Sequence, residues 1–471
     1  MVEPGASVSV RTMEYRIEKD SMGEVKVPAD ALYGASTQRA VDNFPISNIR
    51  FSRRFIWALG LQKGSSATIA AQLGHLAQAK ADAIRQAADE VMDGQHDDQF
   101  VLDIFQTGSG TSTNTNANEV IAARATQILG DGEVHPNDEV NFGQSSNDVI
   151  PAAIHSAAVA ALREELLPAL DKLAKSLETK AAEFVDVVKS GRTHLMDATP
   201  VTLGQEFGGY AAQVRKGSER VENVLPELEE LALGGTAVGT GINAPEGYAA
   251  AVIGLMAERS GFPYREAGNH FEAQGGKDAT VMASGALKTI ATSFFKIAND
   301  IRFLGSGPTS GISELKIKAL QPGSSIMPGK VNPVMSEMMM MVAAHVIGND
   351  VAVTWGGANG NFELNVMMPV IAHNLLESIE LLANAADTFA ERCVDGLEAN
   401  ELRARELVER NAIIVTALNP HIGYDNGARI AKEAVASGRS VRELVLEAGL
   451  MSAEDLDEAL NLKGMTEGGL R

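Results

Sequence analysis

"VIPAAIHSAAVAALREELLPALDKLAKSLETKAAEFVDVV", residues 149–188, is a long stretch of helix-forming residues. Alanine and leucine dominate it and apolar residues recur at helical spacing, so we expect one long helix from Asp148 to about Lys189. Pro151 lies in the first turn, where proline is tolerated, and Pro168 predicts a kink, not necessarily a break. The segment therefore predicts a fold that contains at least one very long helix.

Four further stretches predict long helices, at about residues 200–231, 277–304, 333–355 and 365–393. Five long helices in succession indicate a mainly α fold with a long central five-helix bundle. Nearly the only strand signal is a hairpin around Met22-Gly23, and residues 1–13 are interpreted as an unstructured leader. Beyond about Asn400 the helical patterns shorten. We therefore expect three domains, the outer two small and mostly helical: an N-terminal domain (1–143), the central helical bundle (144–400) and a C-terminal domain (401–471).

The composition of the 471 residues limits the classes of partner. Asp and Glu (61) exceed Lys and Arg (40), giving a net charge of −21, so the chain is a poor candidate for binding nucleic acid. An anionic ligand would need a locally positive site against this global field. The single cysteine, Cys393, excludes an internal disulfide, and the N-terminus lacks a signal-peptide pattern. We expect a cytoplasmic protein.

The most apolar run is "MMMMVAAHVIG", residues 338–348. It is too short to span a bilayer and is flanked by Glu337 and Asp350, so we interpret it as a buried helix of a protein without a membrane partner. Two phosphate-binding patterns are only superficial. "GSSIMPGK" has the wrong spacing for a P-loop, and "GTGINA" (239–244) has no strand–turn–helix unit around it. Without an HExxH pattern or a Cys/His cluster, the sequence gives little support for a metal.

Four segments are unusually polar and rich in glycine for a helical protein. They are "TGSGTSTNTNANEV" (107–120), "HPNDEVNFGQSSND" (135–148), "GRTHLMDATP" (191–200) and "GSSIMPGKVNP" (323–333). Each by itself could be a loop with helix caps, because Ser, Thr and Asn favour N-cap positions. Together they offer hydroxyls, amides, a histidine and a lysine, which is a donor set for a small carboxylate ligand.

The spacing of these segments bears on assembly. If the first long helix is continuous, about 40 residues at ~1.5 Å each separate the second segment from the third by roughly 60 Å. One chain could not easily bring both to one site, whereas antiparallel neighbouring subunits could. The sequence therefore favours a homo-oligomer with shared active sites.

The segment 323–333 resembles the signature loop of the fumarase/aspartase superfamily, and the other three resemble its remaining motifs in the same order. The resemblance runs from about Tyr15 to the C-terminus. His194 and Gly329 stand where aspartases typically have glutamine and alanine, so the chain is most similar to the class II fumarases. Met196 departs from the usual fumarase pattern, and "GTSTN" (110–114) leans slightly toward aspartase.

The resemblance implies a lyase of the tricarboxylic acid cycle that hydrates fumarate reversibly to (S)-malate through an aci-carboxylate carbanion. It implies Ser324 as the base and His194, assisted by Glu337, as the acid. Lys330 and Asn332 would stabilise the charge on the carbanion. The other implied substrate-binding residues are Ser109, Gly110, Thr111, Ser145, Ser146, Asn147, Thr193, Ser325 and Val331.

Further properties are implied by the same resemblance. A homotetramer, metal-independent and without an organic cofactor, is expected to bind the dicarboxylate at sites shared between subunits. A second, peripheral dicarboxylate site would comprise His135, Pro136, Asn137 and Asp138, although a plain Pro-Asn-Asp turn is the alternative there. Two other functions stay open: an aspartate ammonia-lyase of the same superfamily and a non-catalytic scaffold.

Overall fold

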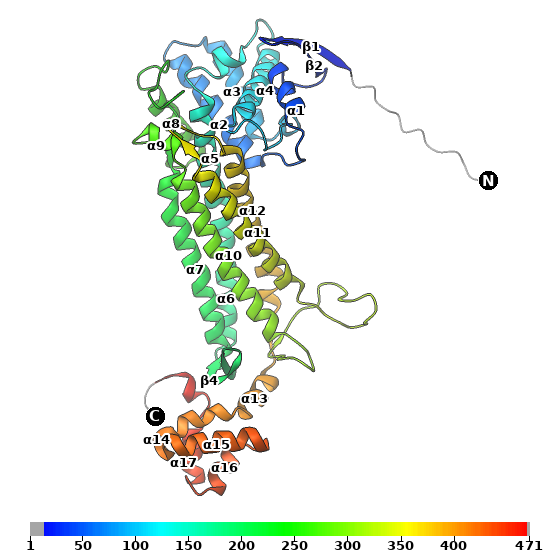
Figure 1. The fold of residues 1–471 in the computed structure, drawn as a ribbon, viewed down its shortest axis with the longest axis vertical. Coiled ribbons are helices and arrows are strands. Elements are labelled where there is room, and N and C mark those ends of the chain that lie inside the picture. Colours follow the sequence, from blue (N-terminus) through cyan, green and yellow to red (C-terminus); the bar gives the residue numbers. More distant parts are fainter. Residues whose placement is uncertain (1–13, 469–471) are drawn as a thin grey trace, which may run out of the picture. The chain divides into compact units, whose positions relative to one another are not determined.

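A computed structural model describes residues 14–468 of the chain, so the leader expected at residues 1–13 lies outside the described residues. The described chain is mainly helical (Figure 1), which confirms the predicted fold class. It divides into two compact units. Unit 1 comprises residues up to 166, 221–288 and 346–380, and unit 2 comprises 167–220, 289–345 and residues from 381 onward. The predicted division into three domains remains a prediction.

Unit 1 is built around helix α2. This helix (Arg53–Gln72) is buried along most of its length and packs against α3, α5 and α8. Other helices of unit 1 are α1 (Ala35–Asn43), α3 (Gln78–Met92), α4 (Thr111–Leu129), α5 (Ser146–Ala161), α8 (Tyr248–Ser260) and α9 (His270–Gly275). The expected N-terminal hairpin is present as β1 (Tyr15–Asp20) paired with β2 (Gly23–Pro28).

The first long helix is interrupted where proline predicts it. Helix α5 is followed directly by one π-helical turn, Leu162–Leu166, and then by α6 (Leu167–Glu183). Pro168 lacks an N–H and its ring crowds the preceding turn, so the hydrogen-bond ladder has to shift there. The helical run ends at Glu183, several residues before the expected end near Lys189, because Val188 already begins a strand.

The other four long helices lie close to their predicted positions. They are α7 (Leu203–Leu228), α10 (Asp278–Leu304), α11 (Val334–Gly357) and α12 (Met368–Arg392). Ion pairs join neighbouring helices within each unit. In unit 2, Arg215 of α7 lies 2.6 Å from Asp171 of α6. In unit 1, Lys288 of α10 lies 2.6 Å from Asp350 of α11.

The structure contains a second hairpin, for which the sequence carries almost no strand signal. Strand β3 (Val188–Thr193) pairs with β4 (Met196–Thr202) in a second hairpin of unit 2. Gly191 allows the two strands to approach, since a Cβ there would lie 2.6 Å from the carbonyl oxygen of Thr199. Glycine and proline hid this hairpin in the sequence, because both residues usually signal a loop.

The interpretation of the methionine-rich run as short and buried is wrong. Helix α11 extends beyond the run at both ends to 24 residues, long and apolar enough by length and composition to cross a membrane. Only 33% of its most apolar window is buried. Met341, Val351 and Trp355 are 67%, 54% and 68% exposed. The reason is that apolar residues occur all around this helix, whereas the described residues of one chain cover only part of its circumference.

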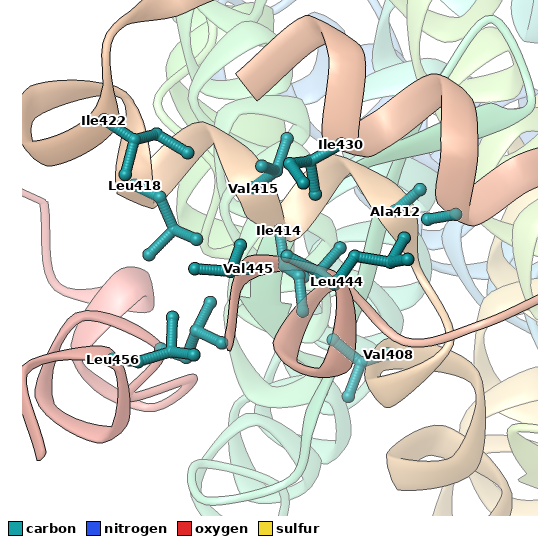
Figure 2. Packing of buried hydrophobic residues seen from close by; sticks show 13 residues of the cluster. Val408, Ala412, Ile414, Val415, Leu418, Ile422, Ile430, Leu444, Val445 and Leu456 are labelled. Atoms are coloured by element: carbon teal, nitrogen blue, oxygen red, sulfur yellow. The ribbon is translucent and has the colours of Figure 1, made fainter. Parts of the chain in front are cut away.

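The C-terminal part of unit 2 consists of short helices, as predicted. Their bounds are α13 (Glu401–Glu409), α14 (Asn419–Ile422), α15 (Tyr424–Ser437), α16 (Val441–Glu447) and α17 (Ala453–Ala459). A 3-10 segment, Ala412–Leu418, carries Val415 and Leu418 into their core. There they gather with Ile430 and Leu456 (Figure 2). This core gives the C-terminal helices a hydrophobic centre of their own.

Candidate active site

In unit 1 the structure brings two of the polar segments together. The hydroxyl of Thr111, the first residue of α4, lies 2.7 Å from the hydroxyl of Ser146, the first residue of α5. The hydroxyl of buried Ser109 lies 2.8 Å from that of Thr111. Two helix N-termini therefore meet at one cluster of hydroxyls. Helix N-termini attract anions through their free N–H groups and the helix dipole.

Gly110 makes this meeting possible. It precedes α4 with a left-handed φ of +71°, and a Cβ there would lie 2.9 Å from the side chain of Ile150 on α5. Any larger residue would be strained in its backbone and would push the two helices apart. We conclude that Gly110 serves the close approach of α4 and α5.

The start of α5 is fixed from two sides. Ser145 forms a capping box: its hydroxyl accepts from the N–H of Asn147, and its own N–H donates to Asp148 Oδ1 at 2.9 Å. The other oxygen of buried Asp148 accepts from the N–H groups of Gly234 and Thr236 at 2.9 and 3.0 Å. Burial raises the pKa of Asp148, against the opposing effect of these N–H donors. The segment Ser145–Asn147 is thereby held rigidly.

In unit 2 the candidate acid lies at the tip of the β3–β4 hairpin. The turn consists of His194 and Leu195, both with positive φ (58° and 62°), between the paired residues Thr193 and Met196. Such two-residue turns favour Asn-Gly, because a left-handed conformation costs other residues roughly 1–2 kcal/mol each. The hairpin accepts this strain and presents His194 to solvent, and strain of this kind is concentrated at functional sites.

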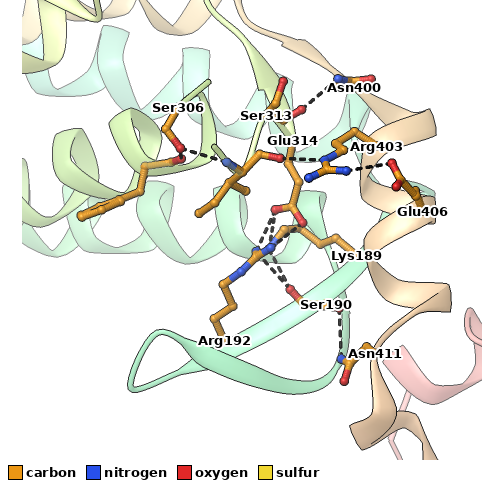
Figure 3. A network of polar contacts seen from close by, with 12 residues as sticks. Lys189, Ser190, Arg192, Ser306, Ser313, Glu314, Asn400, Arg403, Glu406 and Asn411 are labelled. Atoms are coloured by element: carbon orange, nitrogen blue, oxygen red, sulfur yellow. Dashed lines mark hydrogen bonds and ion pairs between the residues drawn. The ribbon is translucent and has the colours of Figure 1, made fainter. Parts of the chain in front are cut away.

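A buried network of charges holds the base of this hairpin (Figure 3). The carboxylate of Glu314, which has no exposed surface, accepts hydrogen bonds from both terminal nitrogens of Arg192 at 2.8 Å. It also lies 3.3 Å from Lys189 Nζ. Lys189 also donates to Glu206 at 2.8 Å. Burial lowers the pKa of Arg192, but its hydrogen bonds to Glu314 and the negative charges of Glu314, Glu206 and Asp197 together outweigh burial and leave that pKa above its ordinary value. Two cations and two carboxylates therefore balance within the network.

The segment 323–333 curls on itself in unit 2. The N–H of Gly323 donates to the carbonyl of Lys330, and the side-chain amide of Asn332 donates to the carbonyl of Gly323 at 2.7 Å. Only glycine fits at position 323, because a Cβ there would clash with the carbonyl oxygen of Lys330. The hydroxyl oxygen of Ser324 accepts from the N–H groups of Ile326 and Met327 at 3.2 and 3.1 Å. Two donors on one oxygen favour negative charge on it. Lys330, Ser325 and Val331 are exposed on the same loop.

Within the described residues of one chain, His194 and Glu337 make no side-chain hydrogen bond or ion pair with each other. Both side chains are exposed, with Glu337 in the first turn of α11. Thr193 is exposed beside His194. The structure thus assembles the hydroxyl cluster of unit 1, while it leaves the candidate acid and its proposed carboxylate partner apart and open to solvent.

The predicted second site is a single exposed π-helical turn of unit 1. His135 caps the turn Pro136–Val140 by accepting at Nδ1 from the N–H of Asp138 at 3.0 Å. Its Nδ1 also lies 3.3 Å from a carboxylate oxygen of Asp138, and Asn137 is exposed. The segment forms the turn that was the alternative to a ligand site. A dicarboxylate site there remains a prediction.

Comparison with known proteins identifies the family. Residues 23–348 match the lyase family model and residues 414–467 match the model of the fumarase C C-terminus. The chain is 55% identical over 466 residues to a class II fumarate hydratase of Mycobacterium tuberculosis, covering 98% of each chain. It is 54% identical to one of Myxococcus xanthus, covering 97% of this chain and 99% of the relative. The chain belongs to the class II fumarase family.

The fold agrees with this assignment. The crystal structure of recombinant class II fumarase from Schistosoma mansoni matches with a TM-score of 0.94 at 37% identity, covering 96% of this chain and 99% of that one. The resemblance that the polar segments indicated is therefore confirmed for a class II fumarase. Among the described residues no three His, Cys, Asp or Glu side chains gather as a metal site would require.

Sequence reasoning missed the residues that support the site. Lys63 is completely buried in α2 of this class II fumarase, and Glu314 is completely buried before the signature loop. A signal for Lys63 existed, because a lysine on the apolar face of the stretch "FIWALGLQKGSSATIAA" (55–71) has no solvent to face. Glu314 gave no such signal, since its partners Lys189 and Arg192 lie more than 120 positions away in sequence.

Replacing Glu314 by glutamine should destabilise the protein strongly. The change leaves buried Lys189 and partly buried Arg192 without their shared carboxylate, which costs about 3 kcal/mol of the free energy of unfolding. Glu398→Gln is the matched control, because its ion pair with Lys316 is exposed and 3.7 Å long, and it should cost well under about 1 kcal/mol. Urea unfolding of both variants gives the comparison, and equal losses would show that the Glu314 network is not holding the hairpin.

Proposed function

We propose that this chain hydrates fumarate reversibly to (S)-malate. The observation that supports the proposal is the meeting of α4 and α5, whose N-termini and hydroxyls offer donors suited to an anion in a chain of net charge −21. Relatives that are 54–55% identical over nearly the full length carry the name class II fumarate hydratase. A dicarboxylate is the substrate that suits both findings.

We propose that the hydroxyl cluster of unit 1 holds one carboxylate of the substrate. Its members would be Ser109, Gly110, Thr111, Ser145, Ser146 and Asn147. Asn147 is positioned by a bond from its amide to the carbonyl of Ala237 at 2.8 Å. Thr193, Ser325 and Val331, on the hairpin and the loop of unit 2, are further proposed substrate-binding residues. These groups bind and orient the substrate without taking its proton.

The signature loop would remove the proton. Malate loses a weakly acidic proton beside a carboxylate, and the carbanion is stabilised as an aci-carboxylate with two negative charges. We propose Ser324 as the base, because the two N–H groups bonded to its oxygen would stabilise the alkoxide. Lys330 would supply a cation and Asn332 an amide to the developing charge, so the reaction would need neither a metal nor an organic cofactor.

His194 would donate the proton to the leaving hydroxyl. A histidine titrates near neutrality, and a carboxylate such as Glu337 beside it would favour the protonated form. Because the two side chains do not meet within one chain, we propose that they meet between subunits of a homotetramer. The exposed apolar side chains of α11, Met341, Val351 and Trp355, support an oligomer. We further propose a cytoplasmic location and a second dicarboxylate site at His135–Asp138.

The first test is an assay of chelated protein with fumarate alone and with fumarate plus ammonia. Loss of the ultraviolet absorbance of the double bond with fumarate alone, and formation of (S)-malate, is the expected result. Loss only with ammonia, giving aspartate, would assign the chain to the aspartases and remove His194 from its proposed role. No loss in either mixture from folded protein would favour the non-catalytic scaffold.

Ser324→Ala should abolish most turnover while leaving substrate binding. Removal of a general base costs about 10²–10⁴-fold in kcat, and the loop's other contacts remain. Ser325→Ala is the matched control on the same loop, and it should alter KM more than kcat because Ser325 would only bind. Steady-state kinetics of both variants provides the measurement. A kcat for Ser324→Ala within a few-fold of the unchanged protein would exclude Ser324 as the base.

Mixing two inactive variants should restore activity if sites are shared. His194→Ala and Lys330→Ala each lack one group, and after subunit exchange some sites would combine an intact His194 with an intact Lys330. We expect partial recovery of fumarate hydration after exchange under mild denaturant, and none before it. Mass spectrometry of the mixed oligomers is the control for exchange. If mixed oligomers form and activity stays absent, each chain carries its own complete site.

A further inference from the structure

Lys63 is completely buried beneath the segment that leads into α5. Its Nζ donates to Asn141 Oδ1 at 2.8 Å and to Gln144 Oε1 at 3.0 Å. It forms no ion pair among the residues that the structure describes. A buried lysine that bonds only neutral amides is costly, because its charge is desolvated without a carboxylate in contact. Such a group calls for a reason beyond stability.

The two amides that Lys63 holds shape the turn in front of Ser145. The NH₂ group of Asn141 donates to the carbonyl of Gln144 at 3.1 Å, and that of Gln144 donates to the carbonyls of Val140 and Phe142 at 3.3 and 3.2 Å. Each amide therefore turns its oxygen to Lys63 and its nitrogen to the backbone of the turn. Removal of the lysine would leave the oxygen of Gln144 without this donor and that of Asn141 with only the amide of Asn114, at 3.2 Å, so both amides would be held less firmly.

Lys63 and Asp148 fix the ends of the carboxylate-binding segment. Lys63 holds the residues just before Ser145. Asp148, the residue just after Asn147, accepts hydrogen bonds from the segment 234–236. The three residues Ser145–Asn147 lie between these two anchors in sequence. We therefore expect the positions of their N–H groups and hydroxyls to depend on the hydrogen bonds of both Lys63 and Asp148.

The charge of Lys63 responds to its surroundings. Burial lowers the pKa of Lys63 to about 7, and the negative charge of Asp148 opposes that shift. Charged groups on the elements packed against α2 include two pairs, Arg259 of α8 with Asp89 of α3, and Lys80 of α3 with Glu139 of the turn Pro136–Val140. An anion bound at the N-terminus of α5 would favour the protonated lysine.

We propose that Lys63 is a positioning residue for the carboxylate-binding N-terminus of α5, and that it takes up a proton when a dicarboxylate binds there. This rests on the proposed function for the identity of the ligand. Lys63 does not touch the substrate in this role. It acts through Asn141 and Gln144 on the backbone of Ser145–Asn147, and through its charge on the affinity for the anion.

Kinetics of Lys63→Met provides the first test. The variant should raise KM for fumarate at least about tenfold with kcat changed less than about threefold, because ground state and transition state lose the same carboxylate contact. Lys180→Met is the matched control, since Lys180 is also a buried helical lysine but pairs with Glu183. An unchanged KM, or a loss of kcat alone as expected from partial unfolding, would overturn the proposal.

Proton uptake provides the second test. Succinate, a dicarboxylate that cannot react, is titrated by calorimetry near pH 7 in two buffers of different ionisation enthalpy. All proteins carry His194→Asn, so that the candidate acid does not contribute. The parent should take up a measurable fraction of a proton per site, and Lys63→Met should take up none. Equal uptake by both proteins would overturn the proposal.

Gln144→Glu keeps the test decisive if Lys63→Met does not fold. It places a carboxylate at the oxygen position 3.0 Å from Nζ, so the lysine stays charged throughout and the proton uptake should disappear. Persistent uptake in this variant would assign the proton to another group. If wild-type protein binds succinate but does not hydrate fumarate, the proposed function fails and Lys63 is still tested by calorimetry. Absence of succinate binding in a protein that also fails to hydrate fumarate would overturn both.

Discussion

The contact between the hydroxyls of Thr111 and Ser146 joins two helix N-termini, and unit 1 is arranged to keep them there. Two positive helix ends repel each other, so their meeting has to be held by other interactions. Gly110 leaves room for it, and Asp148 ties the start of α5 to the segment 234–236. In a chain of net charge −21, these helix ends provide local positive potential, which the proposed anionic substrate would require.

The two units contribute different physical properties to the proposed reaction. The hydroxyls and helix ends of unit 1 are held rigidly, which suits binding and orientation. The reactive groups of unit 2 lie on exposed elements: His194 on a strained hairpin turn, and Ser324 and Lys330 on a loop closed by its own hydrogen bonds. The buried balance of charge around Glu314 keeps this hairpin in place although its turn is unfavourable.

Buried ionic groups recur beneath both halves of the proposed machinery. Lys63 lies below the helix ends of unit 1, and Lys189 with Glu314 lies at the base of the hairpin in unit 2. Such groups contribute little net stability, because desolvation offsets their attraction, but their geometry is specific. Their position supports the view that the fold accepts a cost in stability in order to fix polar groups within hydrogen-bond precision.

The sequence by itself determined the long helices, the short C-terminal helices, the four polar segments and the family, because helical periodicity and glycine-rich motifs are local patterns. Only the tertiary structure decided the β3–β4 hairpin, the exposed face of α11, and the partners of Lys63 and Glu314. Strand pairing and buried charge depend on residues distant in the chain, such as Arg192 and Glu314. No local pattern records these contacts, since the free energy that selects them arises only when the chain is packed.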